Sequence, residues 1–358
     1  MKKINLDDPK TIGKIDRSNM LKLLVEFPEQ CEKAADIGFK FDIRPSYFSG
    51  CSQVVFTGLG GSAIGADLIR SYLADEANVP ISVNRNYTLP GFVSKSTLAV
   101  ASSYSGNTEE TISAYKDARA KGARLVAITS GGEIAKMASA DNVPLITIPG
   151  GLPPRCALGY SFFPSLVLLS KLGIVADKGR DIKKAINLMG RLRDEEIGPQ
   201  VAEKDNQAKS LARRIHGRYP IIYGGADRID TVAVRWRGQL AENSKTISSS
   251  HVFPEMNHNE IVGWENPEGV LKRFVVICLR DVQDHERIKK RMDITRSIIE
   301  KEGVSVIEAE STGDSALERI FSLVYTGDFV SFYLAVLNGV DPTPVDRIAY
   351  LKKELAKG

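Results

Sequence analysis

The sequence has few cysteines and no unbroken long apolar segment, and both shortages exclude classes of protein. Four cysteines stand far apart among 358 residues with no C-x-x-C pair, which favours reduced thiols in the cytoplasm over a disulfide or zinc framework. The opening MKKINLDDPK has no apolar h-region behind it, so no secretory signal is predicted. The longest apolar run, residues 160–176, is broken by Pro164 and Lys171 and indicates a core helix rather than a membrane span.

An excess of charge of one sign is also lacking. The chain carries 48 lysines and arginines against 44 acids, a formal net charge of +4, and stretches such as RLRDEE and RIKKRMD mix both signs. Such mixtures are typical of solvated helix faces, so neither nucleic acid nor a membrane is predicted as a partner. A length of 358 residues is enough for two domains of similar size.

Apolar strand patterns alternate with helical patterns along both halves of the chain. The order strand, glycine turn and helix at VVFTGLGG, residues 54–61, returns at RYPIIYGGADR, residues 218–228, as in a diverged duplication. This alternation predicts an α/β fold of two doubly wound units, each a parallel sheet flanked by helices. A polar stretch separates the halves, and we therefore predict domains at 1–178 and 179–358.

Two glycine turns rich in hydroxyl groups follow strands of the first half. The candidate residues are Gly60, Gly61 and Ser62 in the first turn, and Ser103, Ser105 and Thr108 in the second. Asn107 followed by Glu110 resembles a capping pair for the next helix. Hydroxyls beside a helix N-terminus make a socket for a compact dianion, although the same residues also serve as ordinary turn and cap residues. The pair of turns suits a terminal phosphate monoester.

A dinucleotide site is the competing interpretation of the first turn. Gly58, Gly60 and Ala63 satisfy the G-x-G-x-x-A pattern. That site needs an acid after the second strand for a ribose hydroxyl, or a base for a 2′-phosphate. The segment ISVNRNY offers no acid, and Arg85 is its only candidate for NADP. The pattern alone is weak.

These turns resemble the phosphate-binding loops of the sugar isomerase (SIS) domain family. Together with GLPPRCALGYSF, LAENSK, FPEMNHNEIVGW and DPTPVDRIAYLKKEL, they are similar to the bifunctional phosphoglucose/phosphomannose isomerases, from about residue 50 to the end. The resemblance implies interconversion of glucose 6-phosphate and mannose 6-phosphate with fructose 6-phosphate, without metal or redox cofactor. It also implies a homodimer.

The reaction needs a base, a ring-opening acid and a cation for the enediolate. The resemblance places Glu242, in LAENSK, on the family's base, where desolvation beside an apolar helix can raise the proton affinity of a carboxylate. His258 is the candidate for ring opening, because an imidazole donates and accepts protons near neutrality. A metal site of His251, Glu255 and His258 is an alternative, but the spacing fits no helical metal motif.

Three further residues complete the candidate site. Arg155 follows two prolines that stiffen the backbone, and by resemblance its permanent charge stabilises the enediolate. A cation at a helix start is unfavourable, which suggests a purpose beyond stability. Lys352 resembles the family's C-terminal lysine that assists ring opening, although the adjacent Lys353 is an equal match. Thr343 is a candidate for tolerating both C2 epimers, or a simple turn residue.

Two alternatives and an assembly expectation remain open at this point. Another SIS enzyme would act on a different phosphosugar, and a regulatory SIS protein would bind one without catalysis, normally beside a DNA-binding helix-turn-helix. The long connection around His258 is expected to reach the active site of a partner subunit. Its apolar anchors, expected at an interface between subunits, are Phe253, Met256, Ile261, Val262 and Trp264.

Overall fold

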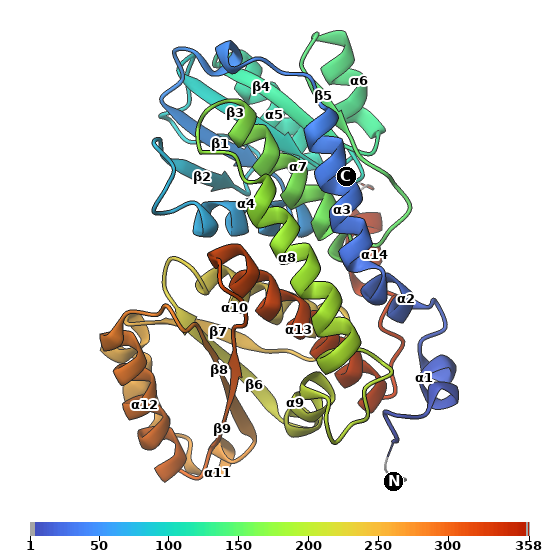
Figure 1. Ribbon diagram of the computed structural model, residues 1–358, viewed down its shortest axis with the longest axis vertical. Coiled ribbons are helices and arrows are strands. Elements are labelled where there is room, and N and C mark those ends of the chain that lie inside the picture. Colours follow the sequence, from blue (N-terminus) through green and yellow to red (C-terminus); the bar gives the residue numbers. More distant parts are fainter. Residues whose placement is uncertain (1–3, 356, 358) are drawn as a thin grey trace. The chain divides into compact units, whose positions relative to one another are not determined.

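The computed structural model describes residues 4–355 and 357, which fold into two compact units (Figure 1). The N-terminal unit comprises Glu26–Met189 and Gly313–Ile320. The C-terminal unit comprises Met1–Val25, Gly190–Thr312 and Phe321–Gly358. The predicted α/β class with two parallel sheets is confirmed. The division differs from the predicted one, because it falls after residue 189 rather than 178 and assigns the first 25 residues to the C-terminal unit.

The sheet of the N-terminal unit has five parallel strands in the order β2-β1-β3-β4-β5. The strands are β1 (Gln53–Thr57), β2 (Ile81–Asn84), β3 (Thr97–Ser102), β4 (Arg124–Thr129) and β5 (Leu145–Thr147). The central strands are almost wholly buried, as expected for a parallel sheet covered on both faces.

Helices cover both faces of this sheet (Figure 1). They are α3 (Phe27–Lys40), α4 (Gly61–Tyr72), α5 (Glu109–Ala120), α6 (Gly132–Ala140) and α7 (Leu158–Lys171), with short turns η1 (Pro45–Phe48) and η2 (Pro154–Cys156). Helix α8 (Gly179–Leu192) follows and leaves this unit after Met189. Ala114 and Tyr115 of α5 pack with Val55 and Ala99 of the strands in one core cluster. On the opposite face α7 packs against α3 and α4. The start of α8 is joined to α4, since the Tyr72 hydroxyl donates to Asp181 across 2.9 Å.

The connections of the N-terminal sheet change direction between β1 and β3, which makes this place a topological switch point. After β1 the chain crosses to β2 on one side, and after β2 it returns to β3 on the other. Thr57 and Ala101 are paired in register, so the turns that follow them begin side by side. Ligands of open α/β sheets bind at such switch points, which is where both hydroxyl-rich turns lie.

The sheet of the C-terminal unit repeats this plan with four parallel strands in the order β7-β6-β8-β9. They are β6 (Tyr219–Gly225), β7 (Ser249–Phe253), β8 (Phe274–Arg280) and β9 (Ser305–Glu310). Among its helices, α12 (Glu286–Lys301) lies on one side of the sheet and α10 (Asp230–Glu242) on the other (Figure 1). The repeated order supports the inferred duplication.

The remaining elements of the chain are short, except for one long helix, whose residues up to Ile320 belong to the N-terminal unit and whose other residues belong to the C-terminal unit. They are α1 (Pro9–Ile15), α2 (Met20–Val25), η3 (Arg193–Ile197), α9 (Gln207–Ile215), η4 (Glu255–His258), η5 (Glu260–Glu265), α11 (Glu268–Leu271), α13 (Ala316–Leu337) and α14 (Asp346–Leu355). Among the described residues, α13 is long and apolar enough to cross a membrane by length and composition. Its apolar window is entirely buried in the protein, which is the position of a core helix.

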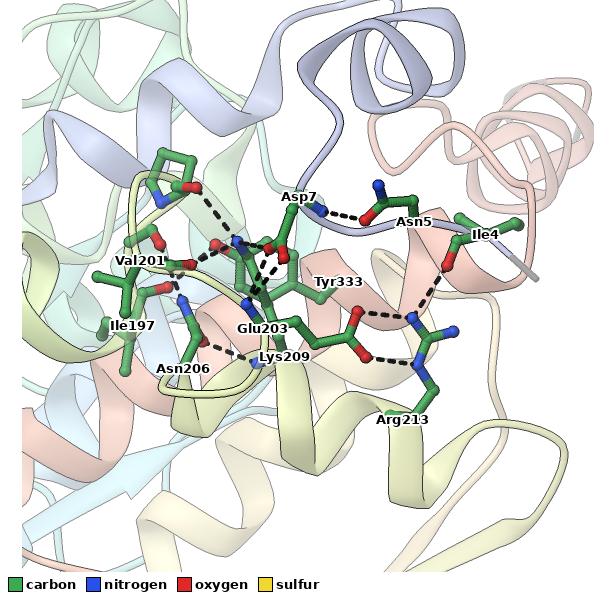
Figure 2. Close-up of polar contacts among 12 residues, drawn as sticks. Ile4, Asn5, Asp7, Ile197, Val201, Glu203, Asn206, Lys209, Arg213 and Tyr333 are labelled. Carbon is green, nitrogen blue, oxygen red and sulfur yellow. Dashed lines mark hydrogen bonds and ion pairs between the residues drawn. The ribbon is translucent and has the colours of Figure 1, made fainter.

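The N-terminal residues are fastened to the C-terminal unit by a polar cluster around Lys209 (Figure 2). Lys209 is fully buried, and its Nζ donates to Asp7 Oδ1 at 2.9 Å and to the carbonyls of Val201 and Pro199 at 2.7 and 3.2 Å. The same ammonium lies over the aromatic face of Tyr333, 5.5 Å from the ring centroid. These contacts explain why the first residues belong to this unit.

Candidate active site

The turn after β1 is built for close approach of another backbone. Gly60 has φ +54°, and α4 begins at the next residue. A Cβ on Gly61 would lie 2.5 Å from the carbonyl oxygen of Pro154, so only glycine fits there. The Ser62 hydroxyl accepts a hydrogen bond from the N–H of Tyr104 at 3.2 Å. The first turn is thereby joined to the second.

The turn after β3 holds its hydroxyl groups by internal hydrogen bonds. Ser103 Oγ donates to Thr108 Oγ1 at 3.1 Å and accepts from Gly106 N at 3.1 Å. Ser105 Oγ accepts from Asn107 N at 3.3 Å and is exposed. These bonds organise the turn and leave the hydroxyls beside the free N–H groups at the start of α5. The arrangement suits an anion with several oxygens.

Asn107 does not cap α5, contrary to the predicted pairing with Glu110. Its Oδ1 instead accepts from the N–H of Glu133 at 3.0 Å, at the start of α6. Gly132, with φ +70°, lies so close to the turn after β3 that a Cβ would be 2.5 Å from Ser105 O. The turn after β4 is therefore a third wall of the site.

Sequence reasoning missed residues of this third turn. Ser130 Oγ donates to the carbonyl of Tyr104 at 2.7 Å, and the Tyr104 hydroxyl accepts from Leu152 N at 3.0 Å. Burial raises the pKa of Tyr104, so its phenol stays protonated and keeps a hydrogen to donate. The glycine pair after the apolar strand, in TSGG, was the available signal.

Arg155 lies in a short turn that is fixed against both loops. It is only 4% exposed, and its turn directly precedes α7. Gln30 Nε2 donates to Cys156 O at 2.8 Å, and the Ser161 hydroxyl donates to Gly61 O at 3.0 Å. The N-terminal unit thus brings the two predicted glycine turns and the Arg155 turn together. A buried guanidinium and the N-terminal ends of α4 and α5 favour a bound anion.

The equivalent turns of the C-terminal unit carry carboxyl groups in place of anion-binding hydroxyl groups. Gly225 is so close to Asp284 that a Cβ would lie 2.8 Å from its Oδ1, and Asp284 Oδ2 accepts from Asp281 N at 3.0 Å. Burial raises the pKa of Asp284, and the hydrogen bond from the backbone N–H of Asp281 offsets part of that rise. Carboxylates in this position repel a phosphate. The duplicated fold therefore carries the anion socket in its N-terminal unit.

Glu242 is the last residue of α10 and is half-buried. The helix is held to α13 by a buried network in which Asp328 accepts from Arg235 at 2.7 Å and from Gln239 at 2.8 Å. One residue beyond Glu242, Asn243 Nδ2 donates to Ser331 Oγ at 2.9 Å. The network fixes the end of the helix from which the carboxylate projects.

Thr343 follows α13 in the same unit, and its segment is bonded to the end of α10. Lys245 Nζ donates to the carbonyls of Glu242 at 2.6 Å and Pro342 at 3.1 Å. The backbone N–H of Thr343 donates to Asp341 Oδ1 at 3.0 Å. Two predicted site residues are thereby linked through a lysine that sequence reasoning did not single out.

His258 ends η4 and is exposed. The segment that carries it was predicted to have little regular structure, but it begins with strand β7 and continues in two short 3-10 turns. The Tyr223 hydroxyl donates to Glu260 and accepts from Trp264 Nε1 at 3.2 Å. These bonds and β7 fix the start and the end of the segment.

The apolar anchors of this segment were expected at an interface between subunits, and that expectation is wrong for most of them. Phe253, Met256 and Trp264 are buried in the core of their own unit, with Ile261 packed against the same cluster. Their size and apolar surface fill the space between β6, β8 and α12. Val262 is 68% exposed and is the anchor that remains on the surface.

Lys352 and Lys353 lie on α14, and both are exposed. Residues three or four apart share a helix face, so Lys352 borders the face of Ile348, Leu351 and Leu355, whereas Lys353 points away from it. These three apolar side chains are 42 to 62% exposed.

The structure gives little support to the two alternative ligands, a metal ion and NADP. Among residues 4–355 and 357, no group of three histidine, cysteine or acidic side chains is arranged to hold a metal ion. Arg85, the candidate for a 2′-phosphate, forms an ion pair with Asp67. The candidate residues divide between the units, with the anion turns and Arg155 in one and Glu242, His258, Thr343 and Lys352 in the other.

Comparisons with known proteins agree with this division. The SIS domain model matches residues 47–149, and the model of the bacterial phospho-glucose isomerase C-terminal SIS domain matches residues 204–355. The C-terminal domain of a glucosamine-fructose-6-phosphate aminotransferase from Francisella tularensis has a TM-score of 0.70 at 14% identity, covering 91% of this chain and 98% of that one. A glucose-6-phosphate isomerase like protein from Thermus thermophilus has a TM-score of 0.63 at 17% identity, covering 95% and 98%. Fold and site define a double SIS-domain protein.

Closer relatives narrow the assignment. A bifunctional phosphoglucose/phosphomannose isomerase from Caldicellulosiruptor bescii is 46% identical over 94% of this chain and 99% of its own. Those from Aquifex aeolicus and Thermoplasma acidophilum are 37% and 35% identical, over 85% and 93% of this chain and 90% and 98% of their own. The chain belongs to the bifunctional phosphoglucose/phosphomannose isomerase family.

Proposed function

We propose that the protein reversibly isomerises glucose 6-phosphate and mannose 6-phosphate to fructose 6-phosphate. The observation that carries this proposal is the anion socket, in which two hydroxyl-rich turns meet the buried Arg155 turn. A terminal phosphate has the charge and the number of acceptor oxygens for such a socket. Membership of the isomerase family supplies the reaction class.

In the proposed reaction His258 and Lys352 open the sugar ring by moving protons at the ring oxygen and the anomeric hydroxyl. Glu242 then takes the proton from C2 of the aldose and returns it to C1, through a planar enediolate, while the hydroxyl proton of O2 is transferred to O1. Arg155 stabilises the negative charge that develops on the enediolate oxygens, which its permanent charge allows at any pH. Thr343 contacts the sugar near C2 and tolerates both orientations of its hydroxyl. No metal or redox cofactor takes part in these steps.

The choice of Lys352 over Lys353 rests on the face of α14. A partner that covers Ile348, Leu351 and Leu355 would bring Lys352 to the edge of the contact and leave Lys353 in solvent. A second copy of the chain is the proposed partner, as the family resemblance implies. The exposed His258 fits the same homodimer, in which it would complete the site of the partner subunit.

The four cysteines support a cytoplasmic location as part of this proposal. Cys31, Cys156 and Cys278 are buried, Cys51 is partly buried, and all four are free thiols. Thiols persist in this state in a reducing compartment.

The proposal is tested by measuring fructose 6-phosphate directly, with glucose 6-phosphate and mannose 6-phosphate supplied separately. Turnover of both sugars is expected, and EDTA should leave it intact because proton transfer uses a carboxylate. Activity that disappears with EDTA and returns with zinc would contradict the metal-free mechanism.

Glucosamine 6-phosphate is supplied separately as a third sugar, and its consumption is measured, because 4-epimerisation of it produces no fructose 6-phosphate. A D-glucosamine-6-phosphate 4-epimerase from Sulfolobus acidocaldarius is 28% identical over 63% of this chain. If glucosamine 6-phosphate is turned over and the other two sugars are not, glucosamine 6-phosphate is the substrate and the proposed substrates are wrong. Binding of fructose 6-phosphate without turnover of any sugar would instead indicate a sensing protein.

A further inference from the structure

Lys245 leaves helix α10 in a backbone conformation that lysine seldom adopts. Its φ is +56°, in the left-handed region. The other non-glycine residues with positive φ in the described part of the chain are Asn19, Asn142 and Asp227, whose short polar side chains favour that region. Glycine would adopt the conformation without cost. The lysine side chain therefore has a use at this position that glycine lacks.

The side chain folds back to bridge two segments. Its Nζ lies 2.6 Å from the carbonyl oxygen of Glu242 and 3.1 Å from that of Pro342, and donates to both. A cation beside the last carbonyls of a helix is favourable, which explains the first bond as a helix cap. The cap does not require the second bond. That bond reaches the loop after α13, directly before Thr343.

Another contact holds the end of α10 to the residue that directly follows α13. Asn338 Nδ2 donates to Ser244 O at 2.9 Å and to Thr246 Oγ1 at 3.1 Å. Asn338 is the first residue beyond α13. Lys245 extends the attachment further along the chain, from Asn338 to Pro342 in the segment that carries Thr343. The bridge fixes the base-bearing end of α10 relative to that segment.

We propose that Lys245 is a positioning residue that sets the geometry between Glu242 and Thr343, and with it the relative use of the two C2 epimers. The inference rests on the proposed function. Glu242 must reach the C2 hydrogen in glucose 6-phosphate and in mannose 6-phosphate, where that hydrogen lies on opposite sides. A small change in the distance from the base to the residue beside C2 affects the two sugars unequally.

The test compares Lys245→Met with a matched lysine. Lys171 Nζ also donates to two backbone carbonyls, those of Phe39 and Phe41 at the end of α3, each at 2.6 Å, but in the N-terminal unit at the end of α7 that lies opposite the Arg155 turn. Values of kcat and KM are measured for both sugars, with the thermal midpoint alongside. Lys245→Met should lower kcat about 10-fold to 100-fold, because misplaced reacting groups cost about that much. The mannose to glucose ratio of kcat/KM should shift about threefold or more.

Lys245→Arg keeps the charge and the donors and should recover most of the ratio. Lys171→Met should lower the thermal midpoint without changing the ratio. Equal losses on both sugars, or none, in Lys245→Met would overturn the inference while the proposed function stands. If Lys245→Met does not fold, the mannose to glucose ratio of kcat/KM is measured in Lys245→Gln, and the same outcomes apply to it. A wild-type protein inactive on both sugars would instead remove the proposed function itself.

Discussion

The Ser62 hydroxyl accepts a hydrogen bond from the backbone N–H of Tyr104 across 3.2 Å and joins the turns after β1 and β3. Through Tyr104 the link extends further, because its phenol accepts from Leu152 N and its carbonyl accepts from Ser130. The turns after three strands and the segment before Arg155 therefore form one connected structure. A change in one turn should therefore shift the other turns as well.

Replacement of Gly61 by alanine tests this connection. The new Cβ would lie 2.5 Å from the carbonyl oxygen of Pro154, so the turn that carries Arg155 must shift. Overpacking of this kind costs about 1–3 kcal/mol of stability. We expect the Kd for fructose 6-phosphate to rise about 10-fold or more, since binding groups lose their alignment. Calorimetry with fructose 6-phosphate measures the loss.

Gly91→Ala is the matched control for that variant. Nothing lies within 4 Å of a Cβ at Gly91, so alanine should leave both affinity and stability unchanged. Equal affinity of Gly61→Ala and the wild-type protein would show that the Arg155 turn and the first glycine turn do not cooperate in binding.

Glu242→Gln should abolish isomerisation while binding persists. The amide is of the same size but cannot accept the C2 proton, and loss of a general base costs about 100-fold to 10,000-fold in rate. The anion socket contains no part of this residue, so the Kd for fructose 6-phosphate should change little. Glu302→Gln, an exposed glutamate at the end of α12, is the control. Near wild-type turnover in Glu242→Gln would remove Glu242 from the mechanism.

The sequence was sufficient to predict elements whose residues are neighbours along the chain. The apolar run before Gly58 became β1, and the amphipathic pattern before Asn243 became a helix that ends at Glu242. Strand β7 was missed because SSHVF has little apolar pattern, and four of its five residues are only partly buried. Its partner strand β6, rather than its own composition, defines it.

Contacts between distant residues were beyond sequence reasoning. Asn107 was assigned to the helix that follows it, but its partner Glu133 lies 26 residues away. Asp7 and Lys209 are 202 residues apart, so the place of the first residues could not be read from the sequence. Local patterns specify turns and helix ends, whereas side-chain partners depend on which elements the fold brings together.

Asp328→Asn should destabilise the C-terminal unit. Asp328 and Arg235 are 3% and 4% exposed, and the amide leaves the Arg235 charge without its counter-ion in the interior. Breaking a buried pair on one side costs about 3–5 kcal/mol, measured by urea unfolding. Glu286→Gln removes an exposed ion pair with Lys289 and should leave the urea midpoint almost unchanged. Similar small losses in both variants would contradict the structural role of the buried network.

The bond between Asp7 and Lys209 should make the attachment of the N-terminal residues sensitive to acid (Figure 2). The hydrogen bond from Lys209 lowers the pKa of Asp7 below its usual 3.8. A lowered carboxyl pKa stabilises the folded state above the unfolded pKa, and this stabilisation is lost as pH falls through the folded pKa. The urea midpoint of the wild-type protein should thus exceed that of Asp7→Asn by a constant amount at about pH 6. This difference should shrink below about pH 4.

Asp205→Asn provides the control for the acid experiment, because its carboxylate lies on the surface 3.8 Å from Lys204. Its urea midpoint should follow that of the wild-type protein closely at every pH. A difference between wild type and Asp7→Asn that stays the same from about pH 6 to about pH 3 would show that the ion pair does not titrate with folding.

Subunit mixing decides whether His258 serves the active site of a partner. Glu242→Gln and His258→Ala proteins should each be inactive alone. If sites are shared, one site of a mixed dimer combines the intact Glu242 of one subunit with the intact His258 of the other, so activity should return when subunits exchange. The double variant mixed with His258→Ala contains no intact His258 and must stay inactive. Exchange is verified with two affinity tags. A mixture that exchanges and remains inactive would place His258 in the site of its own subunit, where its exposed position on η4 would need cover from within the same chain.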